Sequence, residues 1–241
     1  MAQDPISTRP VAVVTGGSQG LGLALARGLA AAGWALVIDA RRSERLDAAV
    51  AELAPQTDVV GIAGDVTDPE HRRALADAAA TLGPVQALVN NASTLGATPL
   101  PRLGEIDPDV LRRLFDVNVV APVALVQELD DQWAPHATVV NITSDAGVEA
   151  YEGWGGYGSS KAALEHASRV LAEERPDLRV LVVDPGDMRT EMHQDAFPGE
   201  DITDRPPPDV SVPGLMALIT GDHHSGRYEA RTMVPAEPRQ P

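Results

Sequence analysis

Six short runs of apolar residues recur along the chain, separated by stretches in which apolar positions return with helical spacing. The runs are continuously apolar rather than alternating, which is typical of strands in a parallel sheet whose two faces are both covered by helices. Strands are predicted at residues 11–17, 34–40, 57–66, 85–93, 137–145 and 178–186. Helices are predicted over residues 21–33, 43–53, 108–129 and 157–174, with one more beginning at Asp68-Pro69.

This alternation predicts one doubly wound α/β domain over residues 11–235, with ligands at the carboxyl ends of the strands. Ser43 is expected to cap the helix that it begins, and Pro69 supplies proline at a first helical position. A final edge strand is predicted at 226–234, after a polar, proline-rich stretch at about 187–213 that we expect to form a flap over a site. Residues 1–10 are expected to form a flexible tail.

Composition narrows the possible functions. The chain has no cysteine, so it can form neither a disulfide framework nor a cysteine metal site. Its net charge of −16 disfavours nucleic acid and anionic membranes as partners. The first ten residues lack an apolar signal region and no run is long enough to span a membrane, so a cytoplasmic location is expected. His223-His224 could suggest a metal, but a solvated loop fits better, and we expect no metal site.

The turn after the first predicted strand contains Gly16, Gly20 and Gly22. Glycine lets a pyrophosphate approach the backbone closely, and the following helix offers free N–H groups at its start. A glycine-rich turn can be purely structural, but its position between the first strand and the first helix favours dinucleotide binding.

Lys161 is the only lysine among 19 basic residues, and it stands four residues after Tyr157 in "YGSSK". A compact ammonium and an arginine fork are not interchangeable at a tight site. The pair could be a chance tetrapeptide on a helix surface. It could equally place a phenol and an ammonium on one helix face for proton transfer.

Several motifs occur in the order and spacing of one family. They are Thr15–Gly22, "GDV" (64–66), "NNAS" (90–93), Asn118 in "DVNVV", Ser144 in "NITS", "YGSSK" (157–161) and "DPG" (184–186). By these motifs the chain resembles the compact single-domain short-chain dehydrogenases/reductases over about residues 10–235. All four asparagines of the chain fall within them. Ser93 is a departure, because the family usually has glycine there. The resemblance implies a single Rossmann-type domain with a mainly parallel seven-stranded sheet flanked by helices.

The resemblance implies four catalytic residues. Tyr157 would be the general acid in reduction and the general base in oxidation, and Lys161 would lower the pKa of Tyr157 and bind the nicotinamide ribose. Ser144 would donate a hydrogen bond to the substrate oxygen, and Asn118 would hold a water in the proton relay. The alternatives are that Ser144 only caps a turn and that Asn118 relieves a helix kink.

The residues expected to bind the cofactor lie at the predicted strand ends and on the helix of Tyr157. They are Gly16, Ser18, Gly20, Leu21, Gly22, Ala40, Arg41, Arg42, Asp65, Val66, Asn91, Ala92, Tyr157, Lys161, Pro185, Gly186 and Thr190. NADP(H) is favoured because Ala40 followed by Arg41 would admit and bind the 2′-phosphate. NAD(H) remains possible because Asp39 could accept hydrogen bonds from the ribose, although Asp39 and Ala40 must point to opposite faces of a strand.

The predicted function is NADP(H)-dependent hydride transfer between the nicotinamide and a small carbonyl or alcohol substrate. The alternatives are an NAD-dependent alcohol dehydrogenase and a non-catalytic dinucleotide-binding regulatory protein. The substrate is expected to touch Ser93, Leu95, Ser144, Trp154 and Met188, with Met192 nearby, although Trp154 could instead pack in the core. The family also implies a homodimer or homotetramer formed through helices 108–129 and 157–174. The stripe of Ala163, Ala167, Val170 and Leu171 fits either such an interface or the core.

Overall fold

The computed structural model describes residues 9–233; most of the predicted N-terminal tail, and everything from residue 234 on, lies outside them. Seven strands form one sheet in the order β3-β2-β1-β4-β5-β6-β7, and every neighbouring pair is parallel. The strands are β1 (Val11–Val14), β2 (Ala35–Ala40), β3 (Val59–Ala63), β4 (Val85–Asn90), β5 (Trp133–Ile142), β6 (Arg179–Asp184) and β7 (Gly226–Glu229). The predicted seven-stranded doubly wound fold is therefore confirmed, with β7 at an edge as expected.

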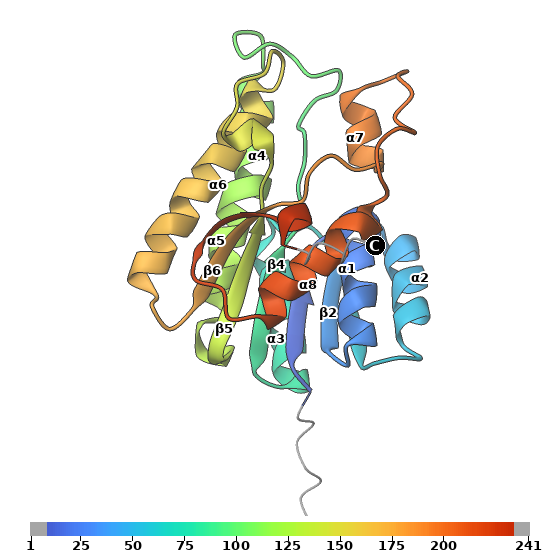
Figure 1. Cartoon of the computed structure of the whole chain (residues 1–241), viewed down its shortest axis with the longest axis vertical. Helices are drawn as coiled ribbons and strands as arrows, with labels where there is room; N and C mark the ends of the chain where they lie inside the picture. Colours follow the sequence, from blue (N-terminus) through green and yellow to red (C-terminus); the bar gives the residue numbers. More distant parts are fainter. Residues whose placement is uncertain (1–8, 234–241) are drawn as a thin grey trace, which may run out of the picture.

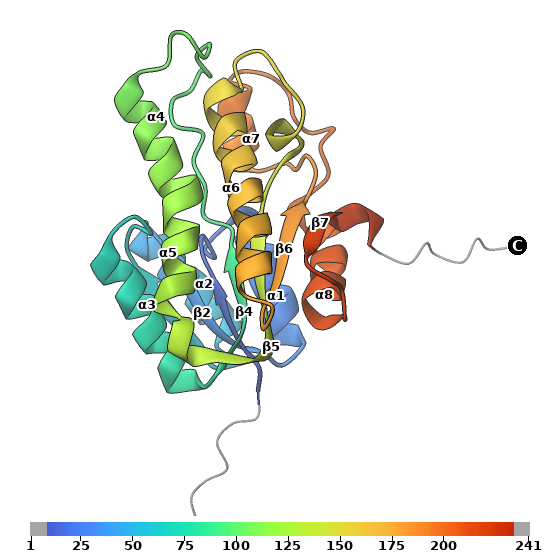
Figure 2. The ribbon, with the colours of Figure 1, turned by 90° about the vertical axis from the view of Figure 1, so that its left-hand side faces the viewer.

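Helices cover both faces of the sheet (Figures 1 and 2). They are α1 (Gly20–Ala31), α2 (Ser43–Leu53), α3 (Pro69–Leu82), α4 (Pro108–Phe115), α5 (Ala121–Glu128), α6 (Gly155–Glu174), α7 (Glu191–Ala196) and α8 (Val212–Thr220). One core layer packs the sheet against α1, α2 and α8, and the other packs it against α3, α5 and α6. The inner strands β1, β2, β4 and β6 are almost wholly buried, which explains why their sequences read as apolar runs, whereas the edge strands β3 and β7 are partly exposed.

Most strands end earlier than predicted. β1 stops at Val14, β4 at Asn90 and β5 at Ile142, because the polar residues that follow leave the ladder and form the loops at the carboxyl edge. The predicted edge strand at 226–234 ends at Glu229 and continues as a short 3-10 turn over Ala230–Thr232.

Three local predictions about helices need correction. Ser43 is the first residue of α2 and not its cap; Arg42 holds the cap position, and no side chain bonds the helix start. The predicted helix at 108–129 is divided by a π-helical segment, Asp116–Val120. Helix α8 was not predicted, because its sequence follows directly on the proline-rich stretch. Pro69 does open α3, and the side chain of Asp68 accepts the N–H of Glu70 as a cap.

The strand order reverses between β1 and β4, and the loops that follow β4, β5 and β6 rise at the same end of the sheet (Figure 1). At such a reversal the connections on either side diverge and leave a crevice beyond the carboxyl ends. The predicted site residues come from the segments around this crevice. None of the helices within residues 9–233 is long and apolar enough to cross a membrane.

Candidate active site

The turn between β1 and α1 leaves the start of α1 open to a ligand. Gly16 and Gly20 have φ angles of 66° and 55°, in the left-handed region that favours glycine. A Cβ on Gly22 would overlap the carbonyl oxygen of Gly16, so only glycine fits there. Gln19 holds the cap position of α1, but its side chain accepts a hydrogen bond from Arg45 and does not cap the helix, and no acidic residue stands in the first turn. Free N–H groups and the helix dipole therefore suit a phosphate at this turn.

Thr15 and Asn91 hold the turn in place. The Asn91 side-chain nitrogen donates to the carbonyl oxygen of Thr15 at 2.8 Å. The backbone N–H groups of Asn91 and Ala92 donate in turn to the Thr15 hydroxyl, at 3.0 and 2.9 Å. Asn91 was expected to contact the cofactor; in this structure its amide braces the glycine turn from the end of β4.

Asp39 is engaged beneath the same turn. One of its carboxylate oxygens accepts the Gly16 N–H at 2.6 Å, and the other lies 2.9 Å from Nε2 of His71 on α3. Both side chains are buried, at 2% and 4% exposure. A carboxylate only accepts hydrogen bonds, so His71 carries its proton on Nε2. A Cβ on Gly64 would overlap the His71 ring, which gives the glycine of the "GDV" motif a packing reason.

Ala40 lies on the opposite face of β2 from Asp39, as strand alternation requires. It packs against the core layer of α1 and α2 and is half-buried. Arg41 and Arg42 follow it and are exposed. Within residues 9–233 neither guanidinium forms an ion pair, with the nearby Glu44 or with any other acid.

Asp65 and Val66, both predicted to bind the cofactor, lie in the loop between β3 and α3. The Asp65 carboxylate accepts the N–H and the hydroxyl of Thr67, at 2.9 and 2.8 Å, and pairs with Arg113 from α4. Burial raises the pKa of Asp65, but these hydrogen bonds outweigh it and leave the pKa below its usual value. Val66 is buried against Val117.

Tyr157 and Lys161 lie one turn apart on α6, and both are buried. The Lys161 ammonium is 5.4 Å from the centroid of the Tyr157 ring. It donates a hydrogen bond of 2.8 Å to the carbonyl oxygen of Ile142, the last residue of β5. The strand end thus fixes the ammonium beside the phenol.

Burial raises the pKa of Tyr157 above its usual range. Hydrogen bonds with the Ser93 and Ser144 hydroxyls lower it, and the charges of Asp184 and Asp145 raise it further. Burial also lowers the pKa of Lys161, to about 8. Desolvation is therefore the largest influence on the pKa of Tyr157 in this structure, and the lowering of that pKa by Lys161 stays a prediction.

Asn118 lies within the π-helical segment and is 1% exposed. Its side-chain oxygen accepts the Ser93 hydroxyl at 3.1 Å and the Thr94 N–H at 3.0 Å. Its nitrogen donates to the Ser160 hydroxyl at 2.9 Å, and Ser160 donates to the backbone oxygen of Tyr157 at 2.7 Å. The amide thus ties the segment after β4 to α6 rather than satisfying carbonyls of its own helix.

Ser144 caps the 3-10 turn Asp145–Gly147 by accepting the Ala146 N–H at 3.2 Å. Its hydroxyl donates to the Asp145 carboxylate at 2.9 Å. The capping role that we considered as an alternative is therefore present, together with the hydrogen bond to Tyr157.

Ser93 and Met188 lie differently from the predicted substrate wall. The Ser93 hydroxyl contacts Asn118 and Tyr157, and Met188 packs against the core layer of α1 and α8. Leu95 and Trp154 do form an apolar cluster with Tyr157, joined by Met192 and Phe197. The Trp154 ring centroid is 5.7 Å from that of Tyr157 and 5.9 Å from that of Phe197. Phe197 was missed, because nothing in the proline-rich stretch marks it as facing Trp154.

The loop after β6 reaches across to the glycine turn. Gly186 has a φ of 71°, and its N–H donates to the Asp184 carboxylate at 2.9 Å. Thr190 caps α7 by accepting the His193 N–H, and a Cβ on Gly20 would lie 3.6 Å from its methyl group. This places the predicted cofactor residues at 185–190 beside those at 16–22.

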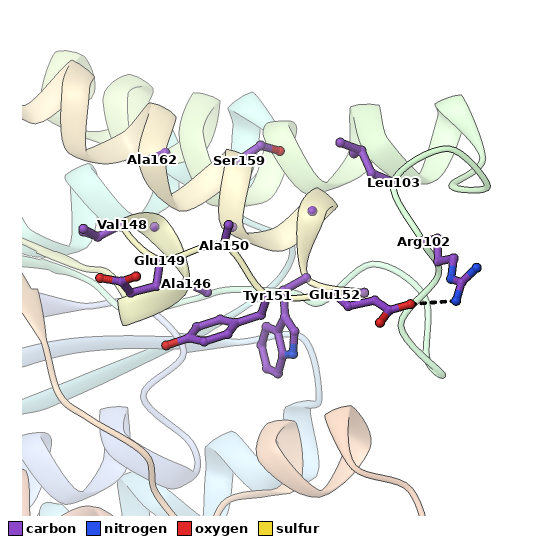
Figure 3. A pocket seen from close by; sticks show the side chains of 15 residues that line it. Arg102, Leu103, Ala146, Val148, Glu149, Ala150, Tyr151, Glu152, Ser159 and Ala162 are labelled. Atoms are coloured by element: carbon purple, nitrogen blue, oxygen red, sulfur yellow. Dashed lines mark hydrogen bonds and ion pairs between the residues drawn. The ribbon is translucent and has the colours of Figure 1, made fainter.

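A hollow of about 470 Å³ lies next to the site but does not contain it. Residues 146–155 line it together with Leu103 and, on α6, Ser159 and Ala162 (Figure 3). At its rim Arg102 pairs with Glu152 at 2.7 Å. Tyr157, Lys161 and Ser144 do not line it, so it is not the place of the chemistry. No group of three or more His, Asp or Glu side chains within residues 9–233 could hold a metal ion.

Comparisons with known proteins agree with this arrangement. The sequence profile of the family described as short chain dehydrogenase matches residues 10–201. Tropinone reductase-like 3 from Erythroxylum coca is 33% identical over 195 residues, covering 80% of this chain and 75% of the relative. A short-chain dehydrogenase from Streptomyces avermitilis is 30% identical with a TM-score of 0.78, over 92% of this chain and 88% of its own. An alcohol dehydrogenase from the archaeon Thermococcus sibiricus, solved with 5-hydroxy-NADP, is 25% identical with a TM-score of 0.82, over 95% and 100%.

Proposed function

Because this chain belongs to the short-chain dehydrogenase/reductase family of NAD(P)-dependent oxidoreductases, we propose that it transfers a hydride between NADP(H) and a carbonyl or alcohol substrate. The observation that carries the proposal is the setting of Tyr157. Its phenol is buried, its pKa responds to the hydroxyls of Ser93 and Ser144, an ammonium lies one helical turn away, and the ring packs in an apolar cluster. This is the arrangement that proton transfer to a carbonyl oxygen needs.

Tyr157 acts as the acid in reduction and as the base in oxidation. Burial keeps the pKa of the phenol high, so at neutral pH it carries the proton that a newly formed alkoxide requires. Ser144 turns its hydroxyl from Asp145 to the substrate oxygen and polarises it. Leu95, Trp154 and Phe197 favour a ketone or aldehyde with an apolar substituent.

The dinucleotide supplies the hydride when it is bound. The open start of α1 and the glycine turn would hold its pyrophosphate, and Lys161 the nicotinamide ribose. Preference for NADP rests on β2. Asp39 is hydrogen-bonded to Gly16 and His71, whereas Arg41 is exposed and has no acidic partner within residues 9–233, which suits it to a 2′-phosphate.

Arg41→Ala tests this preference. Loss of a charge-assisted contact to phosphate should weaken NADPH binding roughly tenfold or more and leave NADH binding nearly unchanged. Arg73→Ala, which removes an exposed arginine from α3, is the matched control. Equal losses for both dinucleotides would show that Arg41 does not bind the phosphate.

The reaction is tested by following NADPH oxidation with a panel of ketones and aldehydes in the parent chain and in Tyr157→Phe. The variant keeps the ring but loses the proton, so turnover should fall by at least about a hundredfold, while NADPH affinity stays within about twofold. Retained turnover in the variant would remove Tyr157 from the reaction.

The chain should also assemble as a homodimer or homotetramer through α5 and α6. Val120 and Val123 on one side and Val170 on the other are between 39% and 52% exposed, which is unusual for large apolar side chains. Leu171, from the stripe predicted on α6, packs instead against the core layer of α3 and α5. The stripe therefore divides between an exposed and a core-facing part.

A further inference from the structure

Arg227 extends from the edge strand β7 to two carboxylates, one on α6 (Glu165) and one at the end of β6 (Asp184). Its Nε lies 3.2 Å from an oxygen of Glu165, and its Nη2 lies 3.1 Å from an oxygen of Asp184. The acids are only 7% and 11% exposed at the side chain, against 31% for Arg227. The register pairs Arg227 with Val182, so the guanidinium enters on the face of the sheet that α6 covers.

Both carboxylates also hold residues that flank the site. Glu165 accepts the hydroxyl of Thr143, the neighbour of Ser144, at 2.7 Å. Asp184 accepts the N–H of Gly186 at 2.9 Å. Arg227 itself donates to the backbone oxygen of Ser144 at 3.5 Å. One arginine thus links the ends of β5 and β6 where they enter the site.

The charges around Tyr157 give this link a chemical consequence. Lys161 faces the phenol from its own helix, Asp145 from the loop after β5, and Asp184 from β6. Both carboxylates disfavour the phenolate. Within residues 9–233, Arg227 is the cation that pairs with Asp184. A buried carboxylate that loses its only ion-pair partner acts on its neighbours with little screening.

We propose that Arg227 is a positioning residue that neutralises Asp184 and Glu165 and thereby sets how readily Tyr157 gives up its proton. The proposal rests on the proposed function of Tyr157. It assigns to the edge strand a role in the reaction, exerted through the two carboxylates and the Ser144 backbone oxygen rather than through a contact with Tyr157.

Four chains separate charge from packing: the parent, Arg227→Gln, Asp184→Asn and the double variant. Arg227→Gln leaves Asp184 unopposed and should raise the pKa of Tyr157 by roughly half to one pH unit. Asp184→Asn leaves the cation and should lower it by a similar amount. In the double variant the pKa of Tyr157 should be close to its value in the parent. A purely structural role of Arg227 would not produce opposite shifts that cancel.

The readout is fluorine NMR of a trifluorotyrosine placed at position 157. The pKa of this phenol is well below that of tyrosine, so its titration falls at a pH that the folded protein can reach. It needs no turnover, so it decides the role of Arg227 even if the parent chain reduces no carbonyl, an outcome that would instead count against the proposed function. If turnover is found, the pH profile of alcohol oxidation should shift in the same order, with a loss of about three- to tenfold at a fixed pH on the rising limb for Arg227→Gln.

Two further variants complete the test. Arg227→Lys keeps the charge and should restore most of the parent titration. Arg179→Gln is the matched control: Arg179 stands at the other end of β6 and donates to Gly221, Ile219 and Thr138, so its loss should lower stability without moving the titration. The proposal would be overturned if the parent and Arg227→Gln gave the same pKa at position 157. It would also be overturned if the double variant kept the pKa of Arg227→Gln instead of returning to that of the parent.

Discussion

At the scale of single residues, the pKa of Tyr157 results from opposing influences. Burial and the carboxylates of Asp184 and Asp145 favour the neutral phenol, while the hydroxyls of Ser93 and Ser144 favour the phenolate. Ser93 stands where the family usually has glycine. Its single hydroxyl proton is donated to Asn118 at 3.1 Å, so the hydroxyl turns to the phenol when the phenolate forms. This chain therefore adds one hydrogen-bonding group to the phenol through a single side chain.

Ser93→Ala removes that group and should raise the pKa of Tyr157. On the rising limb of the pH profile for alcohol oxidation, the rate at a fixed pH should fall about three- to tenfold, because less phenolate is present. Ser159→Ala is a suitable control, since Ser159 bonds only the Gly156 carbonyl on the outer side of α6. An unchanged profile in Ser93→Ala would show that this hydroxyl does not act on the phenol.

Lys161 makes the stability of the protein depend on pH. Its pKa is about 8 in the folded chain, against 10.5 when it is free in water. Between these values the unfolded chain binds more protons than the folded one, so the free energy of unfolding rises with pH across this window. Below pH 8 the ammonium is charged in both states, and its burial costs the fold about 3 kcal/mol.

Urea unfolding of the parent and Lys161→Met at several pH values measures this effect. The free energy of unfolding of the variant minus that of the parent should be larger at pH 7 than at pH 10.5, by about 3 kcal/mol. Comparison with the variant removes the contributions of other titrating groups. A difference that stays constant from pH 7 to 10.5 would contradict the assigned pKa.

At the scale of elements, the connection between β1 and α1 places the phosphate site, and its shape depends on Gly22. Gly22→Ala should cost roughly 1–3 kcal/mol of stability or weaken NADPH binding by a similar free energy, because the added methyl group overlaps the Gly16 carbonyl. Gly104→Ala is the matched control, since nothing lies within 4 Å of a Cβ there. Thermal unfolding and dinucleotide titration of both variants check the expectation. A Gly22→Ala variant with unchanged stability and unchanged NADPH affinity would contradict the close contact between position 22 and the Gly16 carbonyl oxygen.

The order and type of the main elements could be predicted from sequence, because buried parallel strands leave unbroken apolar runs such as Val11–Val14. The ends of the strands could not be predicted, because a strand ends where the residues of the following loop form hydrogen bonds with partners outside the sheet. The π-helical segment at Asp116–Val120 is equally invisible, since Asn118 is held there by Thr94 and Ser160 from distant parts of the chain.

The same limit applies to the site. Tyr157 and Lys161 lie on one face of α6 and Ser144 follows the end of β5, which are placements that motif spacing can predict; their catalytic roles stay predictions. The partners His71, Phe197 and Arg227 lack a local signal, since each meets its partner only after α3, α7 or β7 has packed. The buried acid Asp39 in an apolar strand was the one hint that such a partner had to exist.

At the scale of the whole molecule, α5 and α6 lie side by side (Figure 2). Exposed valines stand at Val120 just before α5, at Val123 on α5 and at Val170 on α6. Val123→Glu would place a charge in the proposed interface between copies, so it should convert the oligomer to a monomer in light scattering while leaving circular dichroism unchanged. Val210→Glu, at an exposed valine beside α8, is the matched control. A parent chain that is already monomeric would contradict the proposed assembly.

The most direct test of the whole account is a pair of fluorescence titrations of the purified parent chain, one with NADPH and one with NADH. We predict that both bind and that NADPH binds at least about tenfold more tightly, because Arg41 is free for a 2′-phosphate while Asp39 is held by Gly16 and His71. Tighter binding of NADH would contradict the proposed cofactor preference. Binding of neither would contradict the dinucleotide site on which the proposed reaction depends.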